Sequence, residues 1–232
     1  MIGQKRTINK SNFYLISTLS ILNTLMLLRV IFTFSFHRII THETLWSYFL
    51  SSIYLICIFI SDINLYLFNS TKLEKFNDFI RNSYSIIAYS YCYSITIEFW
   101  LILFMGLTFG KNPFSEQKSV PKIKILEALY LHLGITIIMI IDLVLTKRKI
   151  NNKNNKKILV IINIIYFLYS ITVLFANYVI LMPAYPFMKD GGIVLMALIF
   201  VVSLILINGS YFLHLFLIKI INKEKIKKII II

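Results

Sequence analysis

The chain is dominated by uninterrupted apolar stretches that are long enough to cross a lipid bilayer. Segments of about 20 residues with almost no charge recur along it, and at 1.5 Å per residue each can span a hydrocarbon core of about 30 Å. Of its 232 residues, 58% are hydrophobic and only 15% are charged, which is too apolar for a soluble domain of this length. The apolar runs are continuous rather than alternating, which favours helices over a membrane β-barrel. We therefore expect an all-α, polytopic membrane protein.

We predict six transmembrane helices in a single domain that covers residues 1–232. The first apolar run follows a basic segment, as in a signal peptide, but it is longer than a signal peptide and no small-residue cleavage site follows it, so we expect it to be retained. The connections are short and leave no room for a separate soluble domain. The predicted spans are residues 13–36, 45–68, 84–109, 125–146, 158–182 and 192–221.

The formal net charge of +14 comes from basic residues that lie in loops beside the predicted spans. Most of them fall in residues 5–10, 72–81, 147–157 and 223–228, which the six-span topology places on one side of the membrane. The positive-inside rule then puts both termini in the cytoplasm. Because no separate basic domain exists, we expect no nucleic-acid partner. The two cysteines, Cys57 and Cys92, lie inside predicted spans and indicate neither a disulfide framework nor a metal site.

Four polar residues from four different spans are predicted to lie in one layer near the extracytoplasmic surface. Thr44 begins the second span at that surface, and Glu98 and His132 lie about 10 Å below it in the third and fourth spans. Asn177 falls at a similar level in the fifth span. Ionisable groups at this depth are costly unless they are used or paired, so the layer is a candidate site.

Other polar groups in the spans have a simpler interpretation. Asp62, Asp142 and His214 lie near the cytoplasmic ends of their spans, and we expect structural roles, with Asp142 either snorkelling to the surface or ion-paired beside the basic residues 147–149. His132 and Asp142 are ten residues apart, about 15 Å along a helix, so they cannot share a hydrogen bond.

Helical spacing extends the candidate layer along two spans. In the second span Ser51 lies on the same face as Thr44, and in the third span Ser94 lies on the same face as Glu98. These stripes fit either a polar pocket or hydrogen bonding between helices.

The layer contains residue types that suit nucleophilic catalysis. A threonine hydroxyl becomes a nucleophile when a neighbouring base takes its proton, and neutral histidine is the usual base. Thr44 and His132 supply such a pair if their helices touch, with Glu98 as a candidate orienting group. His42, in the preceding loop, competes as the base. Neither a metal nor a cofactor is required.

Several short motifs resemble the androgen-induced gene family and its relative, the androgen-dependent regulator of tissue factor pathway inhibitor. The stretch HETLWSYFLSSIYLICIFISD, residues 42–62, is similar to the family's second span, where a threonine precedes an aspartate by eighteen residues. The stretch HLGITIIMIID, residues 132–142, resembles its histidine followed ten residues later by an acid. Phe99-Trp100 and Tyr185-Pro186-Phe187 also match recurring elements.

The resemblance implies a membrane protein that hydrolyses fatty acid esters of hydroxy fatty acids. The expected location is the endoplasmic reticulum or another endomembrane, with the plasma membrane as the alternative. Thr44 would be the nucleophile and His132 the base, and the partner would be a lipid or fatty acyl ester substrate. This chain departs from the family in two places: Asn177-Tyr178 replaces a His-His pair, and Glu98 replaces an apolar residue. A small membrane transporter and a noncatalytic membrane scaffold remain the alternative functions.

Overall fold

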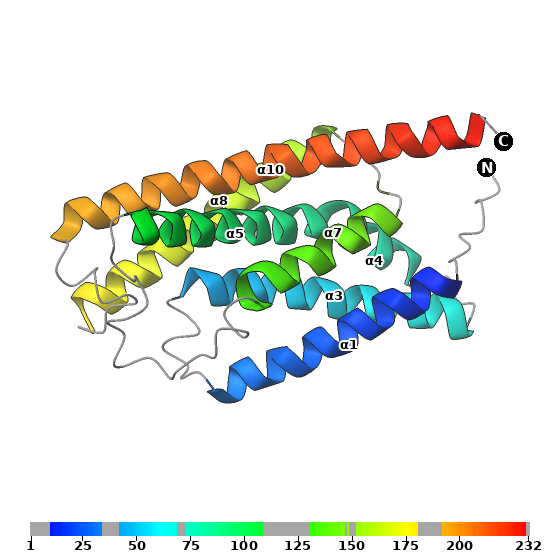
Figure 1. Ribbon diagram of the computed structural model, residues 1–232, viewed down its shortest axis with the longest axis horizontal. Coiled ribbons are helices and arrows are strands. Elements are labelled where there is room, and N and C mark those ends of the chain that lie inside the picture. The colour runs from blue at the N-terminus through cyan, green and yellow to red at the C-terminus, as the bar shows by residue number, and fades with distance from the viewer. Residues whose placement is uncertain are drawn as a thin grey trace.

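The long helices run side by side in alternating directions in the computed structural model (Figure 1). The structure describes residues 10–33, 42–68, 73–108, 130–146, 148, 152–180 and 192–230. No strand occurs in these ranges, and the prediction of an all-α membrane protein is confirmed. The elements are α1 (Lys10–Thr33), α3 (Glu43–Phe68), α4 (Glu74–Phe79), the π-helical turn η1 (Ile80–Tyr84), α5 (Ser85–Thr108), the π-helical turn η2 (Tyr130–Gly134), α7 (Ile135–Leu145), α8 (Asn152–Tyr178) and α10 (Gly192–Ile230).

Some helices extend beyond the predicted apolar spans. The helix α10 continues to Ile230, nine residues past the expected end, and α8 begins at Asn152, six residues before its expected start. The loop before α5 contains a further helical segment, α4 with η1. These added segments are rich in Lys, Glu or Asn, and hydropathy alone marks only the part of a helix that lies in lipid.

The beginning of α1 and the end of α10 lie at the same end of the bundle, called the terminal end below (Figure 1). At the opposite end α3 and η2 begin, while α5 and α8 end. This arrangement agrees with an even number of membrane crossings, which places both ends of the bundle's chain on the same side. The assignment of the terminal end to the cytoplasm stays a prediction from the charge distribution.

The helix α5 is the centre of the bundle and contacts α3, α7, α8 and α10. One face of α5 packs into a core shared mainly with α1, α3 and α7, which includes Leu55, Tyr89 and Met139. The other face packs into a second core with α8 and α10, which includes Tyr91 and Ile162. Residues that follow each other closely on α5 can therefore face different neighbours.

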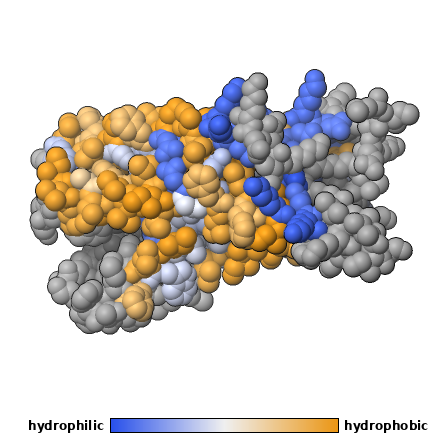
Figure 2. Space-filling model, turned by 90° about the horizontal axis from the view of Figure 1, so that it is seen from above, coloured by the Kyte–Doolittle hydropathy of each residue, from blue (hydrophilic) through white to orange (hydrophobic). Residues whose placement is uncertain are grey.

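The outer faces of the bundle are apolar, as expected of a protein in lipid. By length and composition, four described helices could cross a membrane, in the segments Ser11–Thr33, Glu43–Tyr66, Asn154–Tyr178 and Ile193–Lys223; Tyr130–Leu145 is a shorter apolar helix. Figure 2 shows a continuous hydrophobic surface over one part of the molecule and hydrophilic side chains gathered toward the other. Exposed basic residues on α8 and α10 include Lys156, Lys157, Lys219 and Lys223.

The terminal end is held by an ion network of four buried residues, Asp62, Arg81, Asp142 and Arg148. One guanidinium nitrogen of Arg81 donates to both carboxylate oxygens of Asp62 at 2.6 Å, and another lies 3.6 Å from Asp142. Arg148 pairs with Asp142, as expected for this acid, and donates to the Arg81 carbonyl at 2.9 Å. The network carries no net charge and joins α3, η1, α7 and the connection after α7.

Candidate active site

His132 lies in a local widening of its helix. The turn η2 is π-helical and leads directly into α7. Such turns are rare and occur often at functional sites, because the wider loop of backbone changes the direction of a side chain. Tyr130 and Gly134 bound the turn, and a Cβ atom built on Gly134 would lie 2.7 Å from the Tyr130 ring. Glycine at this position therefore leaves room for the ring.

The backbone of the π-turn is bound by a hydroxyl from α5. Thr96 donates to the His132 carbonyl at 2.5 Å and lies 2.6 Å from the Thr136 hydroxyl. Thr136 in turn lies 3.0 Å from the buried Cys92 thiol. Cys92, Thr96 and Thr136 form what we call the hydroxyl seam between α5 and α7.

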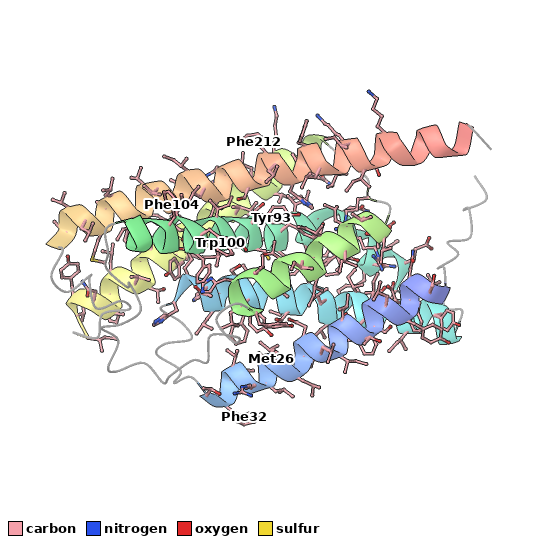
Figure 3. All side chains as sticks on the ribbon, viewed as in Figure 1. Met26, Phe32, Tyr93, Trp100, Phe104 and Phe212 are labelled. Carbon is pink, nitrogen blue, oxygen red and sulfur yellow. The ribbon has the colours of Figure 1, made fainter. Side chains whose placement is uncertain are left out.

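The imidazole of His132 is held by stacking. Its ring lies 4.2 Å from the Phe99 ring, at an interplanar angle of 16°. Phe99 also makes an edge contact with Trp100, which lies with Phe104 toward the end of α5 (Figure 3). The Nδ1 atom of His132 is buried and has no hydrogen-bond partner within the described part of the chain. No described carboxylate thus orients the ring through this atom, unlike in a serine triad.

Thr44 is the second residue of α3 and is half-buried. It precedes Tyr48 by one helical turn on the same face, and the Tyr48 ring packs edge-on against Tyr130 at 6.3 Å. Tyr130 is two residues before His132, and α3 contacts η2. The face of α3 that bears Thr44 is therefore packed against the turn that bears His132.

Glu98 faces a different neighbour. Its carboxyl group and that of Glu43 both lie beside Ser203 of α10. One oxygen of each carboxyl is buried without a hydrogen-bond partner among the described residues. Glu98 thus belongs to an acidic pair on the α10 side of α5, whereas Thr96 and Phe99 contact His132 on the α7 side.

The other predicted site residues, and His42, make contacts away from His132. Asn177 donates to the Met196 sulfur at 3.2 Å, between α8 and α10. Ser94 donates to the Tyr91 carbonyl of its own helix at 3.2 Å, and the buried Ser51 lies beside Cys92. The His42 carbonyl accepts hydrogen bonds from the first turn of α3, so this residue also helps to begin the helix.

The predicted layer therefore divides into two groups on either side of α5. His132 and the Thr44 face of α3 lie on the α7 side, while Glu98 and Asn177 lie toward α10. The sequence reasoning missed Glu43 and the hydroxyl seam. The sequence contains a spacing that indicates the seam: Cys92 and Thr96 are one helical turn apart on α5, and His132 and Thr136 are one turn apart on the fourth span. Among the described residues, no group of three or more His, Cys, Asp or Glu side chains could hold a metal ion.

Comparison with known proteins assigns the family. The model of the FAR-17a/AIG1-like protein family matches residues 16–219, which is most of the chain. The chain belongs to the FAR-17a/AIG1-like family. The match includes the helices that bear Thr44, Glu98, His132 and Asn177, and it confirms the androgen-induced gene resemblance. No curated protein and no solved structure matched the chain.

Proposed function

We propose that this FAR-17a/AIG1-like protein is an intramembrane lipid ester hydrolase with Thr44 as the nucleophile and His132 as the base. The observation that carries the proposal is the π-turn of His132, with its stacked imidazole, packed against the Thr44 face of α3. Family membership supports the same pair of residues through the resemblance of their surrounding motifs. The substrates that this resemblance implies are fatty acid esters of hydroxy fatty acids, and the expected membrane is the endoplasmic reticulum.

The reaction follows ordinary acyl transfer. The Thr44 hydroxyl oxygen attacks the ester carbonyl while the His132 imidazole takes the hydroxyl proton. The tetrahedral intermediate expels the alcohol, which leaves with that proton. Water then cleaves the threonyl ester, with His132 again as the base, and releases the fatty acid. Entry of the substrate from the lipid, with its ester near the membrane surface, would keep the acyl chains in hydrocarbon and the reacting carbonyl close to water.

A fluorophosphonate probe tests the proposal. An activated hydroxyl displaces fluoride from the probe, so purified protein in detergent should gain the mass of a single adduct. We expect Thr44→Ala and His132→Ala to lose the adduct. Thr172→Ala is the matched control, because the Thr172 hydroxyl is exposed and binds the Leu168 carbonyl of its own helix.

Two results would contradict the proposal. Labelling that survives in Thr44→Ala removes Thr44 as the nucleophile. A folded wild-type protein that takes up no label and hydrolyses no fatty acyl ester removes the hydrolase function itself. Asn177-Tyr178, at the position of the family's His-His pair, would then be the first residues to exchange.

A further inference from the structure

The described contacts of His132 come from Thr96 and Phe99 on α5, and neither is a carboxylate. In a triad, a carboxylate binds Nδ1 of the histidine and fixes the direction of the ring. Here Nδ1 of His132 has no described hydrogen-bond partner, and Glu98 is directed to Ser203 on the other side of α5. Some other contact must set the direction in which the imidazole points.

Two contacts from one face of α5 do reach His132. Thr96 binds the His132 carbonyl at 2.5 Å, and Phe99, three residues later, stacks on the imidazole at 4.2 Å. Residues three apart lie on the same side of a helix, so both contacts reach His132 from one rigid surface. The first fixes the backbone of the π-turn and the second fixes the plane of the ring.

We propose that Thr96 and Phe99 are positioning residues for His132 and replace the orienting acid of a triad. This inference rests on the proposed hydrolase function and extends it to Thr96, which lies outside the quoted motifs, and to Phe99, whose motif had no assigned role. The Thr96 hydroxyl has one hydrogen, for which the His132 carbonyl at 2.5 Å is a nearer acceptor than the Cys92 carbonyl of its own helix at 3.0 Å. The Thr96 oxygen can then accept the hydrogen of the Thr136 hydroxyl at 2.6 Å. The bond from Thr96 to the His132 carbonyl therefore does not require the Thr136 hydroxyl.

The simpler interpretation is that Thr96 only joins two helices, as hydroxyl groups often do in membrane proteins. The two interpretations predict different kinetics. If Thr96 only joins two helices, its loss lowers stability, and activity falls only as far as the protein unfolds. Loss of a positioning contact lowers kcat at unchanged stability, because a displacement of about 1 Å costs about 100-fold in rate when the reacting groups are misaligned.

The experiment compares purified variants by the kcat and KM for one fatty acyl ester and by thermal unfolding in detergent. We expect Thr96→Val to lower kcat about 10- to 100-fold, with KM within about twofold of wild type. Thr96→Ser, which keeps the hydroxyl, should restore most of the rate. Phe99→Leu should lower kcat in the same way, which provides a second test if Thr96→Val does not fold.

Two controls separate positioning from packing. Thr136→Val removes a neighbouring hydroxyl of the seam but leaves the Thr96 bond to His132, and Thr172→Val makes the same change on α8. Both should keep kcat within about threefold of wild type. The inference is overturned if wild type is active and folded Thr96→Val and Phe99→Leu keep its kcat, or if Thr136→Val loses as much rate as Thr96→Val. An inactive wild type overturns the hydrolase function and this inference together.

Discussion

At the scale of single residues, Gly134 shows how one missing side chain shapes the site. The Tyr130 ring lies over Gly134 and contacts the Tyr48 ring. The Tyr130 hydroxyl donates a hydrogen bond to the side-chain oxygen of Asn23 at 3.3 Å. A methyl group on residue 134 would displace an aromatic ring rather than the flexible end of a side chain. The space above this glycine is therefore part of the contact between η2, α1 and α3.

We expect Gly134→Ala to destabilise the protein by about 1–3 kcal/mol, because the added methyl overpacks the turn. Thermal unfolding in detergent measures this effect. Gly209→Ala is the matched control, since its Cβ meets nothing within 4 Å, and it should be neutral or slightly stabilising. Equal melting temperatures for the two variants would show that the Tyr130 contact does not constrain the turn.

At the scale of elements, the helices are joined by tyrosine hydroxyls that bind main-chain carbonyls of their neighbours. Tyr91 of α5 donates to Ile162 of α8 at 2.9 Å, and Tyr166 of α8 donates to Phe200 of α10 at 3.0 Å. Each bond satisfies a hydroxyl that would otherwise be unpaired in lipid, and it uses a carbonyl that already belongs to a helix. This pattern gives several of the chain's 14 tyrosines a structural role.

We predict that Tyr91→Phe lowers stability by about 0.6 kcal/mol, the average for hydrogen bonds between membrane helices, and by no more than about 1.7 kcal/mol, the largest such value. The change removes only the hydroxyl and keeps the ring in the core. Tyr178→Phe, at a half-exposed ring, should change the melting temperature much less. A Tyr91→Phe protein as stable as wild type would mean that the hydroxyl contributes nothing net.

The sequence predicts that these elements are helices better than it predicts which neighbour each helix face contacts. Continuous apolar runs indicate helices at α1, α3, α5, α8 and α10, and the spacing to the membrane surface brings Thr44 and His132 to one level. The π-turn at His132 has no such signal, because it depends on the packing of Tyr130 and Thr96 across helices. The direction of Glu98 toward Ser203 is also not predictable, since the neighbours of α5 on each side follow from the tertiary arrangement.

At the scale of the whole molecule, the ion network joins segments that are distant in sequence. Arg148, in the connection after α7, binds Asp142 and the hydroxyl groups of Tyr54 and Tyr89, at 2.7 and 3.1 Å for the two hydroxyls. Asn222 of α10 donates to the Arg148 carbonyl at 2.9 Å. The buried guanidinium thus joins α3, α5 and α7, and the main-chain carbonyl of the same residue joins α10 to them.

We expect Arg148→Met to destabilise the protein by about 3–5 kcal/mol, because it leaves Asp142 buried without its nearest cation. The double variant Asp142→Leu/Arg148→Met should be more stable than Arg148→Met alone, because both charges are then removed. Thermal unfolding of the two single variants and the double variant measures the coupling. Additive losses would show that the two residues act independently.

The position of the ion network also determines where the bundle can open. The charged network holds α3 and α7 together at the terminal end, whereas at the end that bears Thr44 and His132 the described contact between α3 and η2 is the aromatic packing of Tyr48 on Tyr130. Local opening takes place where the contacts are weakest. The two helices should therefore separate first at the end opposite the network, with the network as the hinge. Under the proposed function, a lipid substrate that enters there would reach Thr44 and His132 first.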